Sequence, residues 1–241
     1  MIDIHSHILP GIDDGPSTLM ESLQMAHIAV KNDINIMIAT PHCLNGLYVN
    51  WREGILSACA EFNEALQRHG IPLTVLPGSE VHLNPEIMDA VEKKQLMTLN
   101  DTGRYLSLEL PDQFISQSVI KFINWLKRRK ITPIISHPER NRAIQHNIEL
   151  LHHLILAGAF SQITGGSLTG AFGSHALHSC QDIIERQMVH FIASDAHSPQ
   201  ARPPKVQAAI RKLYSIAGKS RAESIIFKAP QAVLEGRLFQ I

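Results

Sequence analysis

Histidine and carboxylate side chains recur in short pairs along this sequence. His5 and His7 stand two residues apart near the amino terminus, and Asp195 and His197 repeat that spacing much later in the chain. Residues two apart on an extended strand share one side, so each pair could hold one cation. Imidazole nitrogen combined with carboxylate oxygen suits zinc, iron or manganese. The pairs therefore indicate a catalytic metal centre rather than a structural thiolate site.

Short apolar runs alternate with longer stretches of helical periodicity, which predicts strand-helix units around a parallel sheet. The capping pattern of Thr18 and Glu21 begins a helix that should end near Lys31. Gly70, Gly158 and Gly218 fit positions just past helix ends. The predicted strands are 1–4, 35–40, 73–76, 105–108, 132–136, 160–164 and 189–194, and the further helices are 52–68, 85–94, 116–129, 148–157, 174–187 and 203–217.

Six of these seven predicted strands run into a potential metal ligand, and only the strand ending near Thr164 does not. In parallel α/β barrels the carboxyl ends of the strands meet at one face, where active sites are built. A lone histidine is more often a structural hydrogen-bonding residue, but carboxylates gathered at one buried face would repel without a cation. The candidate ligands are His5 and His7, His42, Glu80, Glu109, His137, and Asp195 with His197.

Length and composition set the broad class. The 241 residues suit one domain, 1–241, with the size of a single α/β barrel. Lysine plus arginine and aspartate plus glutamate both total 22, so no basic field is present to recruit nucleic acid. The amino terminus lacks a secretion signal and no run is long enough for a membrane span, so we expect a cytoplasmic protein without membrane insertion.

Charge balance points to the substrate. Asp14, Glu80, Glu109 and Asp195 supply four negative charges, and three divalent ions would supply six positive charges. The surplus of two would be balanced by a phosphate monoester dianion, although a bound hydroxide could absorb part of it.

The block from Asp3 to Pro16, DIHSHILPGIDDGP, resembles the polymerase-and-histidinol-phosphatase (PHP) superfamily, and specifically its bacterial capsule-type protein tyrosine phosphatases. The likeness spans the whole chain. The pairs His-x-His and Asp-x-His are common among metal hydrolases, whereas the long opening block and His137-Pro138-Glu139-Arg140 are far more specific. Other matching segments are Ala39–His42, Gly78–Glu80, Leu108–Glu109, Ser136–Asn141 and Ser194–His197, with Arg202 beyond.

The resemblance implies a distorted barrel of seven strand-helix units, a (β/α)7 TIM-like barrel, holding three divalent ions that are often manganese. It also implies a partner, the phosphotyrosine tail of a membrane-associated tyrosine kinase that controls polysaccharide export. Cys43 stands where some relatives have a second histidine, and Asp13 is expected to brace its loop while Asp14 binds metal. The implied ligand sets are His5, His7, Glu80 and Asp195; Glu80, Glu109 and His137; and Asp14, His42 and His197.

Arg140 and Arg202 are the candidates for binding the phosphate, because guanidinium offers paired donors and stays charged. From the residues alone, Arg140 could equally pair with Glu139 or another carboxylate, and the resemblance favours the substrate. A phenolate leaving group has a conjugate acid of pKa ~10 and needs little protonation, so a general acid is optional. His42 or a metal-bound water could serve as one.

The sequence raises four other functions. Cys180 and Arg186 match the bare Cys-x5-Arg spacing of cysteine-based phosphatases, but the stretch is expected to be helical and carries two acids, so it cannot curl around a phosphate. A small-molecule phosphatase of the histidinol-phosphatase type is the main alternative, and a nuclease would require a basic groove. Outside enzymes, the chain could be a metal-stabilised binding module.

Overall fold

Nine short parallel strands, counted among residues 1–239, form the centre of the molecule. The computed structural model describes residues 1–239. Each of the seven predicted runs overlaps a strand, and two additional short strands, β3 and β5, follow the second and third runs. The strands are β1 (Ile2–Ser6), β2 (Ile36–Ala39), β3 (His42–Cys43), β4 (Thr74–Pro77), β5 (Glu80–His82), β6 (Tyr105–Glu109), β7 (Thr132–Ser136), β8 (Phe160–Thr164) and β9 (Phe191–Ala193).

The strands form two sheets, β1-β2-β4 and β3-β5-β6-β7-β8-β9. His42 pairs with Glu80 in the same offset by which Ala39 pairs with Pro77, so β3 and β5 continue the β2 and β4 pairing after a short break. A parallel bridge between Ser6 and Ala196 links the end of β1 to the segment after β9. The α/β barrel-like class predicted from the sequence is confirmed, with seven strand positions.

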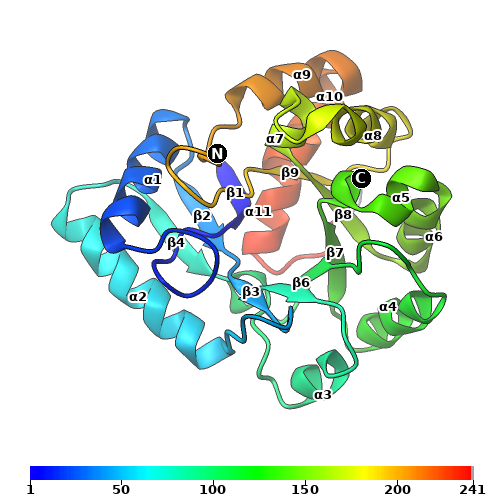
Figure 1. Cartoon of the computed structure of the whole chain (residues 1–241), viewed down its shortest axis with the longest axis horizontal. Helices are drawn as coiled ribbons and strands as arrows, with labels where there is room; N and C mark the ends of the chain where they lie inside the picture. Colours follow the sequence, from blue (N-terminus) through cyan, green and yellow to red (C-terminus); the bar gives the residue numbers. More distant parts are fainter. Residues whose placement is uncertain (240–241) are drawn as a thin grey trace.

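Helices surround the strands. The helices α1 and α2 lie on one side, and α4, α6, α8 and α9 lie around the remaining sides (Figure 1). The predicted capping box is present, because Thr18 accepts from the Glu21 backbone and Glu21 accepts in return. The main helices are α1 (Leu19–Lys31), α2 (Arg52–Arg68), α3 (Ile87–Glu92), α4 (Ser118–Arg128), α6 (Glu149–Ala157), α8 (Gly173–Glu185) and α9 (Gln207–Ala217). Short elements are η1 (Leu99–Asp101), η2 (Pro138–Arg140), α5 (Arg142–His146), α7 (Gly165–Thr169), α10 (Lys219–Glu223), η3 (Ser224–Lys228) and α11 (Ala229–Leu234).

The carboxyl-terminal helices were not predicted, yet they complete the core. Ala229 and Val233 of α11 are buried in one cluster with the strand residues Ile4, Ile134 and Phe191. Two further clusters lie between the strands and the outer helices. The last helix is therefore held by contacts with strands that are distant in the sequence.

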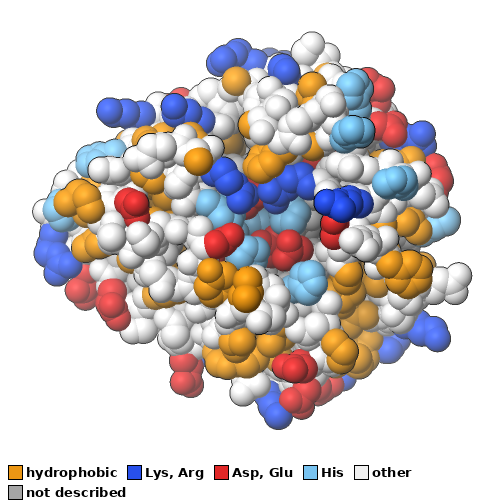
Figure 2. Space-filling model, in the orientation of Figure 1, with side chains coloured by type: hydrophobic (Ala, Val, Ile, Leu, Met, Phe, Trp, Pro, Cys, Tyr) orange, Lys and Arg blue, Asp and Glu red, His pale blue; other side chains and the backbone are white. Residues whose placement is uncertain are grey.

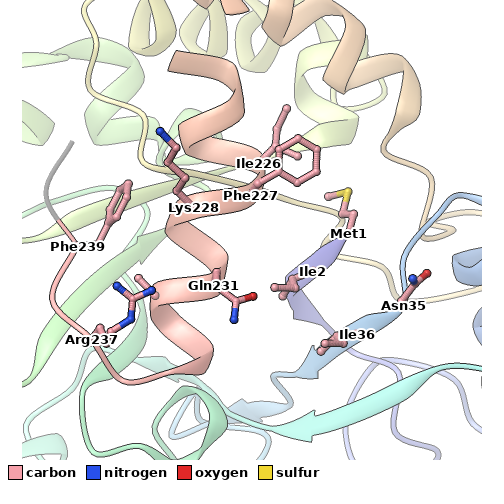
Figure 3. Close-up of a pocket in the computed structure, with 11 residues that line it drawn as sticks. Met1, Ile2, Asn35, Ile36, Ile226, Phe227, Lys228, Gln231, Arg237 and Phe239 are labelled. Carbon is pink, nitrogen blue, oxygen red and sulfur yellow. The ribbon is translucent and has the colours of Figure 1, made fainter. Parts of the chain in front are cut away.

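A cavity of about 740 Å³ lies beside α11, where β1 and β2 begin (Figure 3). Apolar side chains such as Ile36, Ile226 and Phe227 line much of it, together with Lys228 and Arg237. The described residues that line it include no histidine, aspartate or glutamate, so this cavity is not the predicted site. Within residues 1–239, no helix has the length and hydrophobicity needed to cross a bilayer.

Candidate metal centre

A second hollow, of about 270 Å³, lies at the opposite ends of the strands and gathers the predicted residues. Figure 2 shows histidines and acids on its floor, basic side chains along one rim and hydrophobic side chains along the other. The carboxyl ends of parallel strands meet at one face, and each candidate residue follows or ends such a strand, which explains why these residues converge. The lining residues are Asp14, His42, Glu80, Glu109, Leu110, Asp112, His137, Arg140, Asn141, Asp195, His197 and Arg202.

Four side chains from three strand ends enclose a space suited to one cation. The Nε2 atoms of His5 and His7 are 3.3 Å apart. Glu80 Oε2 lies 3.4 Å and 3.5 Å from these two nitrogens, and Asp195 Oδ1 lies 3.4 Å and 3.7 Å from them. Ligands held ~2.1 Å from a tetrahedral ion lie roughly 3.4 Å apart. The four atoms therefore have the separation of ligands around a shared ion.

Unpartnered buried atoms support the same interpretation. Glu80 Oε2, Asp195 Oδ1 and His42 Nδ1 are buried and have no hydrogen-bond partner among residues 1–239. Leaving such a group unsatisfied costs about 1–3 kcal/mol, and more when it is charged. A cation bound by these atoms would remove that cost, so the donor set fits a divalent metal.

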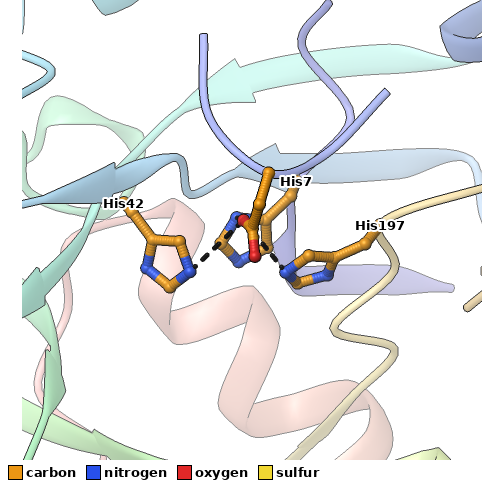
Figure 4. A group of neighbouring side chains, drawn as sticks. His7, His42 and His197 are labelled. Atoms are coloured by element: carbon orange, nitrogen blue, oxygen red, sulfur yellow. Dashed lines mark ion pairs between the residues drawn. The ribbon is translucent and has the colours of Figure 1, made fainter. Parts of the chain in front are cut away.

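Two more groups of ligand atoms adjoin the first. Glu80 Oε1 is 2.8 Å from His137 Nε2, and Glu109 Oε1 is 3.9 Å from the same nitrogen. On the other side, Asp14 Oδ1 lies 3.4 Å from His42 Nε2 and 3.5 Å from His197 Nε2. Figure 4 shows the rings of His7, His42 and His197 around that carboxylate. All nine predicted ligands thus lie in one cluster.

The two aspartates of the loop between β1 and α1 differ in burial and in the groups that they contact. The side chain of Asp13 is buried, and it accepts hydrogen bonds from His7 Nδ1 at 2.6 Å, Gly15 N at 2.9 Å and His42 N at 3.1 Å. Asp14 is half exposed and directs one oxygen at the hollow. Gly15 is required for this fold, because a Cβ there would lie 2.3 Å from the His7 carbonyl oxygen.

Two of the candidate ligands have left-handed backbone conformations. His137 has φ 34° directly after β7, and Asp195 has φ 51° two residues after the end of β9. Such conformations cost about 1–3 kcal/mol in residues other than glycine and concentrate at functional sites. Here they reverse the chain where each strand ends, beside the hollow.

Burial and mutual charge shift the pKa values of the cluster. Burial alone would raise the pKa of Glu80, but His5 and His137 outweigh it and hold that pKa well below the usual value. Burial opposes protonation of His7, yet Asp13 and Glu80 raise its pKa to about 10. His197 shows the reverse, since burial and the neighbouring His7 lower its pKa to about 2. Glu80 is therefore ionised, and protons would compete with a cation for the Nε2 atom of His7.

Asp195 also connects the centre to both candidate arginines. Its Oδ2 accepts from Arg140 Nη2 at 2.5 Å and from Arg202 Nη2 at 2.6 Å, while Oδ1 faces the histidines. Arg140 does not pair with Glu139. Glu139 is buried and instead accepts from the Thr164 backbone and the Ser167 hydroxyl. Arg140 and Arg202 are 21% and 29% exposed and line the hollow.

The strand without a predicted ligand contributes a supporting residue. Gln162 of β8 is buried, and its Oε1 lies 2.6 Å from His5 Nδ1, which leaves His5 Nε2 free to face the other candidate ligands. Partners of this kind orient metal-binding histidines and raise their basicity. The available sequence signal was an amide side chain at the centre of a predicted strand that carries no metal ligand.

The cysteine alternative does not fit the structure. Cys180 lies inside α8 and is buried, and burial raises the pKa of its thiol. Arg186, the other half of the spacing motif, pairs with Asp182 and Glu149 on the surface. A neutral thiol within a helix cannot act as a phosphate-binding nucleophile.

The fold and the site define an α/β barrel protein with a histidine-carboxylate centre at the carboxyl ends of its strands. The family model for capsular polysaccharide synthesis, CpsB/CapC, matches residues 1–235, and the chain belongs to that family. The family predicted from the opening sequence block is thereby confirmed.

Individual relatives agree with this assignment. The chain is 38% identical to the tyrosine-protein phosphatase YwqE of Bacillus subtilis over 252 residues, covering 99% of each protein. It matches a crystal structure from work on YwqE and Streptococcus pneumoniae CpsB, described as unique metal-dependent tyrosine phosphatases, with TM-score 0.95 and 38% identity, covering 100% and 96% of the two chains. A histidinol phosphate phosphatase from Lactococcus lactis matches with TM-score 0.56 and 11% identity, covering 93% and 94%, which shows the fold alone.

Proposed function

We propose that this chain is a metal-dependent phosphatase that hydrolyses phosphotyrosine in proteins. The observation that carries the proposal is the convergence of His5, His7, Glu80 and Asp195, with two buried carboxylate oxygens that have no partner among the described residues. The phosphotyrosine substrate is inferred from the names of the relatives, which include tyrosine-protein phosphatase YwqE.

The chain would hold three divalent cations, manganese by preference, with zinc or iron as alternatives. When bound, these cations would neutralise phosphate oxygens and acidify water near neutral pH. Glu80 would contribute one oxygen to each of two ions, since Oε2 faces His5 and His7 while Oε1 faces His137. The proposed sets are His5, His7, Glu80 and Asp195; Glu80, Glu109 and His137; and Asp14, His42 and His197.

Arg140 and Arg202 would bind the phosphate oxygens. Each uses one Nη2 donor on Asp195, which holds one end of the guanidinium group at the rim and leaves further N–H donors for a ligand. His42 has carboxylates on both sides, Asp14 near Nε2 and Glu80 near Nδ1. We therefore assign it primarily as a metal ligand and only secondarily as a general acid. The tyrosine phenolate, with a conjugate acid of pKa ~10, can leave without a dedicated acid.

The small hollow suits a phosphate on an extended aryl group better than a large ligand. We further propose that residues 1–241 act as one catalytic domain in the cytoplasm. The physiological substrate would be the phosphotyrosine tail of a membrane-associated tyrosine kinase that controls capsular or exopolysaccharide synthesis, in line with the family description.

The decisive experiment compares three phosphate esters on manganese-loaded protein: a phosphotyrosyl peptide, a phosphoseryl peptide and histidinol phosphate. We expect phosphate release chiefly from the first, and complete loss with a chelator. Preference for histidinol phosphate would instead establish the small-molecule alternative, and no hydrolysis of any ester would refute a phosphatase.

The role of Arg140 can be tested separately. Arg140→Ala should lower kcat/KM about 100-fold, the effect of removing one stabilising donor, while metal content stays unchanged. Arg142→Ala is the matched control, because Arg142 lies in the same segment but is exposed and pairs with Asp112. Wild-type turnover in Arg140→Ala would remove this residue from the site.

A further inference from the structure

An aromatic ring lies under both rim arginines. Phe172 belongs to the turn between α7 and α8, after the strand that contributes no metal ligand. The guanidinium carbon of Arg140 lies 4.7 Å from the centre of the Phe172 ring, and that of Arg202 lies 5.3 Å from it. Both distances are within the range of cation–π attraction. One half-buried ring therefore contacts both cations.

The hydrogen bonds of the two arginines leave their orientation incompletely fixed. Arg140 and Arg202 share a single acceptor atom, Asp195 Oδ2, and the Nε atoms of both are buried with no hydrogen-bond partner within residues 1–239. A single hydrogen bond at Nη2 permits rotation of each guanidinium plane. The two guanidinium cations also repel each other, because both bind the same carboxylate oxygen. The negative face of an aromatic ring reduces that repulsion and restricts the rotation.

The position of the ring is set by Gly166 on α7. A Cβ built at Gly166 would lie 2.8 Å from Phe172 Cε2 and 3.3 Å from Cδ2, so the absence of a side chain allows the ring to approach. The helix α7 itself is held by Glu139, which accepts from Thr164 N and Ser167 Oγ. The residue beside Arg140 thus anchors the segment that carries the ring.

We propose that Phe172 is a positioning residue for the phosphate site, whose ring holds Arg140 and Arg202 with their free N–H donors toward the hollow. This inference rests on the proposed function for the identity of the ligand. Phe172 itself need not contact the substrate, since it acts through the two guanidinium groups.

The test separates the π face from simple packing. In manganese-loaded protein, Phe172→Leu keeps an apolar side chain and should weaken binding of inorganic phosphate about tenfold, equivalent to ~1.4 kcal/mol. KM for an aryl phosphate should rise, and Phe172→Tyr should restore both values. Phe227→Leu is the control, because Phe227 is exposed beside the cavity at the other end of the strands.

A second variant moves the ring without changing it. Gly166→Ala should weaken phosphate binding in the same direction, whereas Gly54→Ala, a helical glycine with no atom within 4 Å of its added Cβ, should have no effect. Phosphate binding in folded Phe172→Leu that equals wild type, or a loss in Phe172→Tyr as large as in Phe172→Leu, would overturn the proposal. These binding measurements remain decisive even if the wild-type protein hydrolyses no phosphate ester, an outcome that would refute only the proposed function.

Discussion

Asp13 offers the sharpest test of how the centre is held together, because it supports the site without being assigned as a ligand. Its two carboxylate oxygens accept from three donors: Oδ2 from His7 Nδ1 and His42 N, and Oδ1 from Gly15 N. Asp13→Asn preserves the size and shape of the side chain but replaces one oxygen by an NH2 group. An amide accepts at one position only, so an N–H of Gly15 or His42 must then face another donor.

The expected magnitude follows from the lost bond. A hydrogen bond to a charged group contributes about 1.5–3 kcal/mol, and leaving a buried donor unsatisfied costs a similar amount. Residues that orient metal-binding histidines typically change metal affinity about 10–100-fold when mutated. Since Asp13 contacts His7 directly and His42 through its backbone, we expect weaker metal binding at two neighbouring positions.

Titration of the metal-free protein with manganese, followed by calorimetry and by phosphatase activity, measures the effect. Asp13→Asn should need roughly 10–100-fold more manganese for half-maximal activity, with turnover recovering at saturation. Asp89→Asn is the control, because Asp89 is exposed and pairs with Lys93 on the surface of α3. Identical manganese curves for Asp13→Asn and wild type would refute the positioning role.

Other properties can be tested independently of the metal centre. Burial lowers the pKa of His190 from 6.5 to about 4, so the unfolded state binds a proton at a higher pH than the folded state does. The free energy of unfolding should therefore fall by about 2 kcal/mol from pH 7 to pH 5. Urea unfolding in the presence of a chelator should show a smaller fall for His190→Gln than for wild type, and equal pH slopes in the two proteins would contradict this prediction. Alkylation of the cysteine thiols should leave turnover near the wild-type rate, because all three cysteines are buried. Inactivation without unfolding would restore the hypothesis that Cys180 is a nucleophile. Thr18→Ala should lower the free energy of unfolding by ~1 kcal/mol through loss of the capping box with Glu21, and an unchanged urea midpoint would show that the cap is dispensable.

The strands could be predicted because their signal is local. Each run of apolar and β-branched residues is bounded by polar or helical sequence, and burial on both faces keeps the run continuous. The carboxyl-terminal helices gave no such signal. Ala229 and Val233 are buried only because α11 packs against the strands, and a sequence window around residue 230 does not contain those partners.

The candidate metal ligands could also be predicted from the sequence. Parallel strands place their carboxyl ends at one edge, so His5, Glu80 and Asp195 could be expected to meet without knowledge of any contact. The assignment of Asp14 to the hollow and Asp13 to the loop came from resemblance, and the hydrogen bonds of Asp13 supply its physical basis.

Supporting contacts required the tertiary structure. Gln162 reaches His5 from the strand that carries no ligand, and Phe172 lies under two arginines whose positions in the chain differ by 62 residues (202 − 140). By itself the sequence determined the seven main strand positions and which strand ends carry the candidate metal-binding groups, because strand periodicity and parallel pairing act through local rules. Only the folded chain decided which side chains orient those groups, because such contacts depend on how non-adjacent elements pack.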